Sequence, residues 1–133
     1  MSDPTTIPDA LRYTADHEWF RPDGTEVLVG VTDYAQHQMT DVVFVDLPPV
    51  GKAIEARGSV LTVESVKTVS DVYAPVAGTV TAVNDQLKGH PEFVNQDPYG
   101  KGWLFRLRPA QPITGSEGLS AKEYAAVVAA APP

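Results

Sequence analysis

The sequence predicts a mainly β protein, a small barrel or sandwich hybrid with a short internal helix and a C-terminal helix. Val- and Thr-rich runs are separated by Pro and Gly clusters, a pattern typical of short strands joined by turns. Helix-start signals occur at two places, one internal and one near the C-terminus. The 133 residues, 43% of them hydrophobic, are enough for one domain with its own core. We therefore expect a single domain over residues 1–133.

The N-terminal part contains two strand regions and the internal helix. Residues 1–9 hold two Pro and little periodicity, which predicts a loose N-terminal lead. Residues 13–21 predict one or two short strands, and residues 26–31 a strand with Val at alternate positions. Thr32 is a suitable N-cap, because its hydroxyl can accept from a backbone N–H of the first turn. A short helix is expected from there to about Met39.

The remainder predicts further strands and the second helix. Residues 42–47 predict a buried strand that two prolines end. Residues 84–102 are interleaved with Asn, Pro and Gly and are expected to form loop and turns. Residues 103–108 alternate apolar and basic side chains, which predicts a half-exposed strand. The opening S-A-K-E of residues 120–130 matches a capping box, so a helix is expected there.

The longest β-prone run, residues 59–73, has a lysine near its middle. It contains no Gly, Pro or Asn, and its Val and Thr content favours strand over helix. Because strands usually run about 3–10 residues, we expect it to fold back near its centre. Lys67 then lies at the tip of a hairpin, with its amine in water. Pro75 marks the end of this region, and Gly78 permits the turn into a strand over residues 79–83.

Composition excludes several classes of function. The formal net charge of −7 argues against binding a phosphate backbone, which needs clustered Lys and Arg. The longest apolar stretches are too short to span a membrane, and the first residues lack the basic and apolar regions of a targeting segment. We therefore expect a cytoplasmic protein. With no Cys, the chain has no disulfide and no thiol of its own, so any thiol chemistry must arrive on a prosthetic group.

The other chemistry-bearing residues lack the spacing of a metal or catalytic site. His17, His37 and His90 are far apart, with no Cys near them, which argues against a metal site. Ser65 and Ser70 have no adjacent His, so a nucleophilic triad is not supported.

The lysine hairpin followed by A-P-V-x-G-x-V resembles the swinging-arm domains that carry lipoate or biotin on a lysine. Biotin carriers generally place Met on both sides of that lysine, whereas here it lies between Val66 and Thr68. Lipoyl domains of 2-oxo-acid dehydrogenases usually read Asp-Lys-Ala, which Val66 does not match. The sequence E-S-V-K at residues 64–67, with Ser-Asp at residues 70–71, resembles the H protein of the glycine cleavage system.

The resemblance extends over roughly residues 10–130. Further motifs match in the same order: Tyr13 and residues 17–19, 30–36, 41–48, 83–84, 94–95 and 98–104. Two departures stand out. Thr40 occupies a position where the family often has Gly, which affects the expected turn, and Thr68-Val69 replaces an Ala-led pair.

The resemblance implies a lipoyl-domain-like hybrid fold of the hammerhead type, with a lipoyl group in amide linkage to Lys67. It implies that Glu64 and Gly78 take part in recognition by the lipoate-attaching enzyme. The chain would be a carrier and not an enzyme. A pyridoxal-phosphate glycine decarboxylase would load an aminomethyl group, and an aminomethyltransferase would pass the one-carbon unit to tetrahydrofolate. A dihydrolipoyl dehydrogenase would then reoxidise the group.

The resemblance also implies a cleft on the protein body that takes up the loaded arm. Glu18 and Asp71 are the candidate acids for that cleft, since a carboxylate there would pair with the cationic aminomethyl group. The alternative is that both are ordinary exposed acids. Trp19, Tyr99 and Trp103 are expected in the core rather than in the cleft.

Two other functions are compatible with the sequence. A lipoylated protein of this kind could serve as a lipoate donor or scaffold without glycine cleavage. An orphan β-barrel adaptor, unmodified on Lys67, is the third reading. Genes for the decarboxylase and aminomethyltransferase beside this one would favour glycine cleavage.

Overall fold

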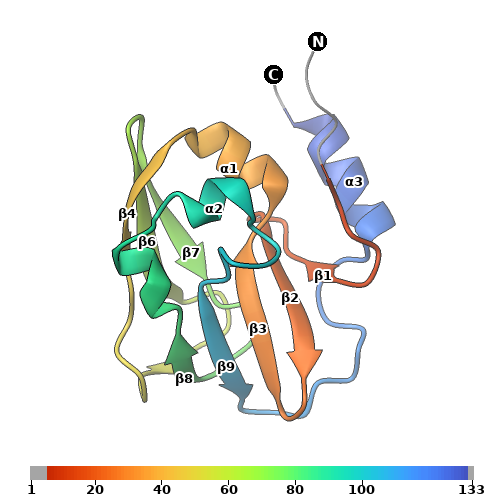
Figure 1. The fold of residues 1–133 in the computed structure, drawn as a ribbon. Helices are drawn as coiled ribbons and strands as arrows, with labels where there is room; N and C mark the ends of the chain where they lie inside the picture. The colour runs from red at the N-terminus through yellow and green to blue at the C-terminus, as the bar shows by residue number, and fades with distance from the viewer. Residues whose placement is uncertain (1–5, 132–133) are drawn as a thin grey trace.

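The computed structural model describes residues 6–131, and in that part nine strands form two open sheets rather than a closed barrel (Figure 1). The larger sheet has the order β1-β2-β3-β9-β8-β5, and the smaller one β4-β6-β7. The strands are β1 Arg12–Tyr13, β2 Glu18–Asp23, β3 Glu26–Val31, β4 Val42–Asp46, β5 Ala53–Ile54, β6 Ser59–Ser65, β7 Val69–Tyr73, β8 Gly78–Val83 and β9 Phe105–Pro109. The mainly β prediction is confirmed, in its sandwich form.

Two helices begin at the expected caps. The side chain of Thr32 accepts from the backbone N–H of Ala35 and caps α1 (Asp33–Met39). Ser120 and Glu123 form a reciprocal capping box at the start of α3 (Ala121–Ala130). The helix α1 ends at Thr40 with φ of 61°, a left-handed conformation that explains why Gly suits this position.

Two short helices interrupt the segment that was expected to be loop. A 3₁₀ turn, η1, spans Asp85–Lys88, and the single-turn α2 spans Phe93–Gln96. The side chain of Asn84 caps η1 by accepting from the N–H of Gln86. The prediction of loop and turns over residues 84–102 missed these two helices, because helices of four residues are too short to give a periodic sequence signal.

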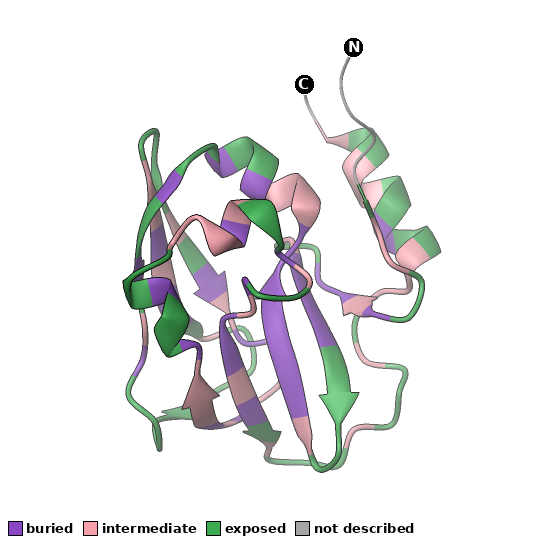
Figure 2. Ribbon diagram, in the orientation of Figure 1, coloured by how far each residue is buried: buried purple, intermediate pink, exposed green. Residues whose placement is uncertain are grey.

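The main core lies between the two sheets, where the buried residues of Figure 2 concentrate. It is built largely from Val, Leu and Phe of β3, β4, β6, β8 and β9. A second cluster, under α3, contains Leu11, Tyr13, Trp19, Leu28 and Tyr124. The rings of Tyr13 and Tyr124 stack at 4.7 Å between centroids, which fixes the helix against β1.

β4 differs from its prediction as a buried strand. Val42 and Val45 are buried, but Val43 is 52% exposed and Phe44 is 50% exposed. A register shift lies between Val42 and Phe44 where β4 pairs with β6. Because the bulge adds a residue on one strand, Phe44 points away from the core despite its apolar character.

The N-terminal lead is held to the body where the structure describes it. Residues 1–5 of the expected loose lead lie outside the described part. Residues 6–8 form no helix or strand, yet the hydroxyls of Tyr99 and Tyr13 donate to the carbonyls of Thr6 and Pro8, each at 2.6 Å. No helix among residues 6–131 is long and apolar enough to cross a membrane.

Candidate functional site

Lys67 lies at the tip of the β6–β7 hairpin, as the sequence predicted. Val66 and Lys67 form the turn, because Ser65 donates its backbone N–H to the carbonyl of Thr68 at 2.8 Å. Lys67 is exposed, and no carboxylate within the described residues lies within ion-pair distance of its amine. The amine is therefore free to react with an external partner.

The Ser65 hydroxyl stabilises this turn. It accepts from the backbone N–H of Lys67 at 3.2 Å and from that of Thr68 at 3.1 Å. Two-residue hairpin turns usually need positive φ, yet neither Val66 nor Lys67 has it. The Ser65 oxygen bonds both inward-facing N–H groups instead, so it holds a turn without glycine at the position of the lysine.

Glu64 is half-buried and lies next to the tip, on the same face of the sheet as Phe44 and Val69. It is the direct partner of Phe44 in β4 and of Val69 in β7, and direct antiparallel partners share a face. Its carboxylate thus lies on the outer face of the small sheet, beside the turn that presents Lys67.

Gly78 is buried at the start of β8, between β5 and β9. It pairs with Ile54 on one side and with Pro109 on the other. A Cβ at this position would collide with the carbonyl oxygen of Arg108 and come within 3.0 Å of the Leu107 side chain. The residue must therefore be Gly for the sheet to pack, which is a structural requirement and does not depend on any partner.

Glu18 is buried, with 2% of its surface exposed, so the alternative of an ordinary exposed acid is wrong for this residue. One carboxylate oxygen accepts from the hydroxyl of Thr14 at 2.5 Å, and the other accepts from the backbone N–H of Tyr73 at 3.1 Å. Burial raises the pKa of Glu18, and these two hydrogen bonds oppose that shift. Glu18 joins the start of β2 to the end of β7.

A cavity of about 160 Å³ lies where β2, β7 and α1 meet. Asp16, Glu18 and Asp71 line it, and its lining has no Lys or Arg. The other lining residues are His17, Val31, Tyr34, Ala35, Gln38, Met39, Ser70 and Val72. The structure therefore brings together both acids that the resemblance placed in a cleft, although they lie far apart in the sequence.

The three acids of the cavity differ in what they already bind. Asp16 pairs with Arg57 at 2.7 Å, and both Glu18 oxygens accept hydrogen bonds within the fold. Asp71 is exposed and accepts only from the Ser59 hydroxyl, at 3.0 Å, among the described residues. Asp71 therefore has the most acceptor capacity left, and its pairing with Thr62 places its side chain on the outer face of the edge strand β7, where it borders the cavity.

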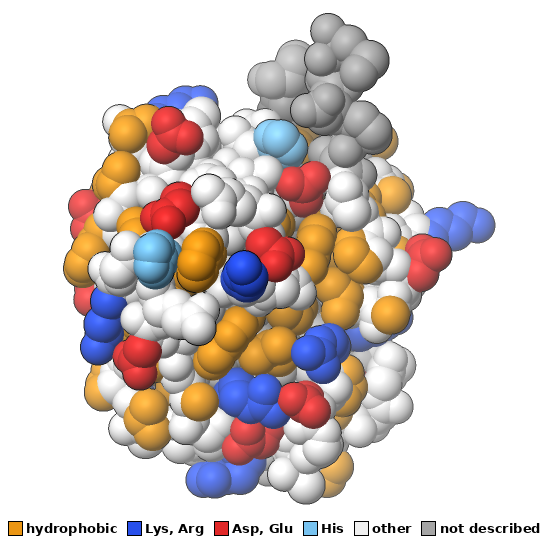
Figure 3. Space-filling model, viewed as in Figure 1, with side chains coloured by type: hydrophobic (Ala, Val, Ile, Leu, Met, Phe, Trp, Pro, Cys, Tyr) orange, Lys and Arg blue, Asp and Glu red, His pale blue; other side chains and the backbone are white. Residues whose placement is uncertain are grey.

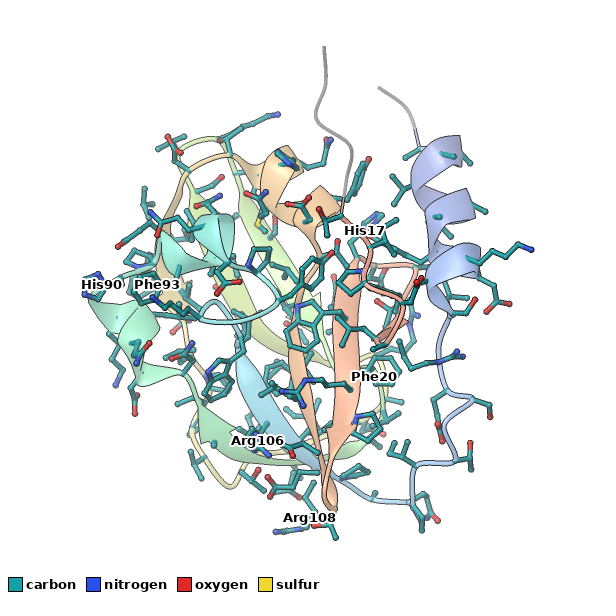
Figure 4. All side chains as sticks on the ribbon, turned by 45° about the vertical axis from the view of Figure 1, so that its right-hand side comes forward. His17, Phe20, His90, Phe93, Arg106 and Arg108 are labelled. Carbon is teal, nitrogen blue, oxygen red and sulfur yellow. The ribbon has the colours of Figure 1, made fainter. Side chains whose placement is uncertain are left out.

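His17 also lines the cavity, a position that the sequence did not predict for it. It has φ of 72°, and Figure 4 shows it between β2 and the C-terminal helix. Its Nδ1 lies 2.8 Å from the hydroxyl of Tyr124, and its ring lies 4.7 Å from that of Tyr34. Burial lowers the pKa of His17, and the charge of Asp16 opposes this shift. The H-E-W motif named this residue, but its conformation depends on the distant helix.

The aromatic residues expected in the core lie outside the cavity lining. Trp19 is fully buried and donates its indole N–H to the carbonyl of Pro98 at 2.9 Å. Tyr99 and Trp103 are half-buried and pack against the second cluster. Of the three, only Trp19 is fully buried, and the other two cover its cluster.

Comparison with known proteins establishes the family of this chain. The family model for the glycine cleavage H-protein matches residues 11–131. The chain belongs to the glycine cleavage H-protein family. The resemblance that the motifs indicated is thereby confirmed.

Individual members of this family match over nearly the whole chain. A glycine cleavage system H protein of Thermus thermophilus is 53% identical over 122 residues, which cover 92% of this chain and 95% of that protein. The probable glycine cleavage system H protein of Thermoplasma acidophilum is 52% identical over 122 residues, with 90% and 94% covered.

A solved structure in the family has the same fold. The crystal structure of a glycine cleavage system H protein from Mycobacterium marinum superposes with a TM-score of 0.83 at 41% identity. The superposition covers 92% of this chain and 99% of that one. The two-sheet arrangement described above is thus that of an H protein.

Proposed function

We propose that this H-protein family member carries a lipoyl group in amide linkage to Lys67. In this role it shuttles an aminomethyl group and reducing equivalents between a glycine decarboxylase, an aminomethyltransferase and a dihydrolipoyl dehydrogenase. The observation that carries the proposal is an exposed lysine, without an ion-pair partner among residues 6–131, at a turn that the Ser65 hydroxyl holds within the E-S-V-K sequence. The chain acts as a carrier and substrate and not as an enzyme.

The residues at the hairpin tip fit attachment of the group. The neutral amine of Lys67 attacks the carbonyl carbon of an activated lipoyl donor, an amide bond forms, the bond to the donor's leaving group breaks, and one proton passes to solvent. Nothing is oxidised or reduced in this step. Glu64 lies beside the turn and would contact the attaching enzyme. Gly78 would contribute through the packing of β8 against β9, since it has no side chain to offer.

The bound group supplies what the sequence lacks, a disulfide and dithiol that can exchange with thiols and hold the aminomethyl cargo. This chain's residues would bind and protect that cargo in the acidic cavity. Asp71 would pair with the cationic amine, and the apolar side chains of Val31, Ala35 and Met39 would exclude water from it. Glu18 would add negative charge while holding the cavity wall in place.

The cavity favours glycine cleavage over a role as a lipoate donor or scaffold. A donor needs only the acylated lysine, and no part of that role uses a pocket lined by three acids and no Lys or Arg. Glycine cleavage, by contrast, puts a primary ammonium group on the arm, which such a pocket would bind.

The test begins with the site of attachment. The chain is incubated with a purified lipoate ligase, lipoate and ATP, and the adduct is located by peptide mass spectrometry. We expect it on Lys67 alone, and Lys67→Arg should fold normally but remain unmodified, because arginine offers no acylable amine. An adduct on Lys52, Lys88, Lys101 or Lys122 with Lys67 bare would contradict the proposal.

The second stage tests the carrier role itself. The acylated chain is combined with the decarboxylase, the transferase and the dehydrogenase, and glycine-dependent ammonia release is measured. Wild-type chain should support release and Lys67→Arg should not. Ammonia release with the arginine variant would show that the reaction does not run through this lysine. Acylation without any ammonia release would instead favour the donor role.

A further inference from the structure

We propose that the outer face of the small sheet around Lys67 is the docking surface for the enzyme that acylates this lysine. The partner would present an apolar depression bordered by Lys and Arg side chains. The inference rests on the proposed attachment of lipoate to Lys67. We call the surface the tip patch, and define it as Val43, Phe44, Val66 and Val69.

The tip patch holds nearly all of the exposed large hydrophobic side chains. Among residues 6–131, five such side chains are exposed, and four of them lie here, with exposures of 52% for Val43, 50% for Phe44, 69% for Val66 and 63% for Val69. The fifth, Val50, lies beyond β4 and outside the patch. Because single exposed apolar residues are ordinary but a cluster is not, this gathering indicates a contact surface.

Strand pairing makes the patch continuous. Phe44, Glu64 and Val69 are consecutive direct partners across β4, β6 and β7, so they form one row on the outer face. The turn is joined to the same region, since Val66 donates its backbone N–H to the carbonyl of Asp41 at 3.0 Å. The patch is therefore held by the sheet in a fixed position relative to the backbone of Lys67.

The border of the patch carries unpaired negative charge. Asp41 and Asp46 are exposed at the two ends of β4, and Glu64 lies within the row. In the described part of the chain, none of these three carboxylates has a Lys, Arg or His within 4.0 Å. Figure 3 shows hydrophobic, acidic and basic side chains next to one another at the hairpin tip, at the upper left. Charge complementarity therefore calls for a basic border on the partner.

The short reach of a bare lysine identifies which partner uses this surface. Before acylation, the reacting amine extends only one side chain beyond the turn, so the attaching enzyme must approach the residues beside it. The decarboxylase, the aminomethyltransferase and the dehydrogenase act on the end of the lipoyl arm. Because that arm is long and flexible, they can act without touching the turn. A surface that continues directly from Val66 and Val69 to Lys67 thus suits the attaching enzyme above the others.

The test compares three substitutions in the patch with one outside it. Phe44→Thr, Val66→Thr and Val69→Thr are combined, because threonine keeps strand propensity at exposed positions while removing apolar surface. Val50→Thr is the matched control, being 61% exposed and outside the patch. Acylation by purified lipoate ligase with lipoate and ATP is followed by intact mass at several concentrations of the chain.

We expect the triple variant to raise the KM for the chain about tenfold with kcat nearly unchanged, since a few desolvated apolar contacts dominate most interfaces. Val50→Thr should match wild type, and the wild-type KM should rise with salt. A thermal unfolding midpoint equal to that of wild type shows that the triple variant is folded, and Val66→Thr alone serves if it is not.

A triple variant with the wild-type KM would overturn the proposal. So would a patch that proves to join two copies of the chain, seen as concentration-dependent dimerisation that the triple variant loses while its KM stays unchanged. Failure of the wild-type chain to be acylated at Lys67 is a separate result, and it would refute the proposed function on which this inference rests.

Discussion

The hydroxyl of Tyr124 lies 2.8 Å from Nδ1 of His17 and 2.7 Å from the hydroxyl of Thr32. The C-terminal helix thereby holds both a wall residue of the acidic cavity and the N-cap of α1. Burial raises the pKa of Tyr124, so the phenol keeps its proton. The helix is remote from the lysine in sequence and in the fold, yet it supports the cavity proposed to receive the loaded arm.

Replacement of Tyr124 by Phe should lower the free energy of unfolding by about 1–2 kcal/mol, because the buried Thr32 and the half-buried His17 lose a partner while the ring is kept. Urea denaturation measures this change. Tyr34→Phe is the matched control, since no hydrogen bond of the Tyr34 hydroxyl is present among the described residues. Equal losses for the two variants would show that the Tyr124 hydroxyl is dispensable.

Substitutions of Glu18 and of Asp71 should differ in their effect on the free energy of unfolding, because Glu18 is bonded within the fold and Asp71 is exposed. Glu18→Gln should cost about 1 kcal/mol, because an amide cannot accept from both Thr14 and Tyr73 as the carboxylate does. Asp71→Asn, at an exposed position, should change stability by less than about 0.5 kcal/mol. Urea denaturation of both variants, with lipoylation of Lys67 verified by mass, checks this difference.

The double variant of these acids should shorten the lifetime of the aminomethyl-loaded chain, because neutral amides of similar shape no longer attract the cationic amine. The effect is expected to be modest, since partly exposed ion pairs contribute about 0–1 kcal/mol. Release of formaldehyde and ammonia from isolated loaded protein, without the transferase, gives the rate. An unchanged rate would mean that the two carboxylates do not hold the cargo.

His17 should make the fold sensitive to acid. Its pKa is lowered on folding from the ordinary 6.5, so the folded chain binds fewer protons than the unfolded chain just below that pH. The His17 contribution to stability is therefore fully present above pH 6.5 and is lost as the pH falls toward the lowered value. Asp16 and Glu18 line the same cavity. Both acids must therefore be unchanged in the two chains that are compared, wild type and the His17 variant.

The measurement is the free energy of unfolding of wild type and His17→Asn from neutral pH downward. Asparagine does not titrate and tolerates the φ of 72° that this position requires. The wild-type chain should lose its advantage over the variant as the pH falls below 6.5. Parallel curves would show that His17 does not titrate differently in the folded state.

Gly78→Ala should destabilise the fold rather than simply weaken recognition. The added methyl would meet the Arg108 carbonyl and the Leu107 side chain, so β8 must move away from β9. We expect a loss of about 1–3 kcal/mol, typical of overpacking, in thermal or urea unfolding. Gly89→Ala is the control, since nothing lies within 4 Å of its added Cβ. Full stability with slow acylation would instead assign Gly78 to the enzyme contact.

The sequence by itself determined the local features. The Val- and Thr-rich run without Gly or Pro is too long for one strand, so it folds back as β6 and β7 and places Lys67 at the turn. The capping residues Thr32 and Ser120 began α1 and α3, because their hydroxyls bond N–H groups only a few residues away. Such interactions depend on neighbours in the chain, so the order of residues is enough to predict them.

Only the tertiary structure decided which residues meet. Asp16 to Glu18 and Ser70 to Val72 line one cavity because β2 and β7, which belong to different sheets, approach each other beside α1. Glu18 is buried where β2 meets β7 and bonds the backbone of Tyr73 there, and the exposure of Phe44 follows from a bulge in β4. Polarity alone predicted the opposite for both residues. Long-range strand pairing decides the burial of these side chains, because burial depends on the layer that covers a side chain and not on its polarity.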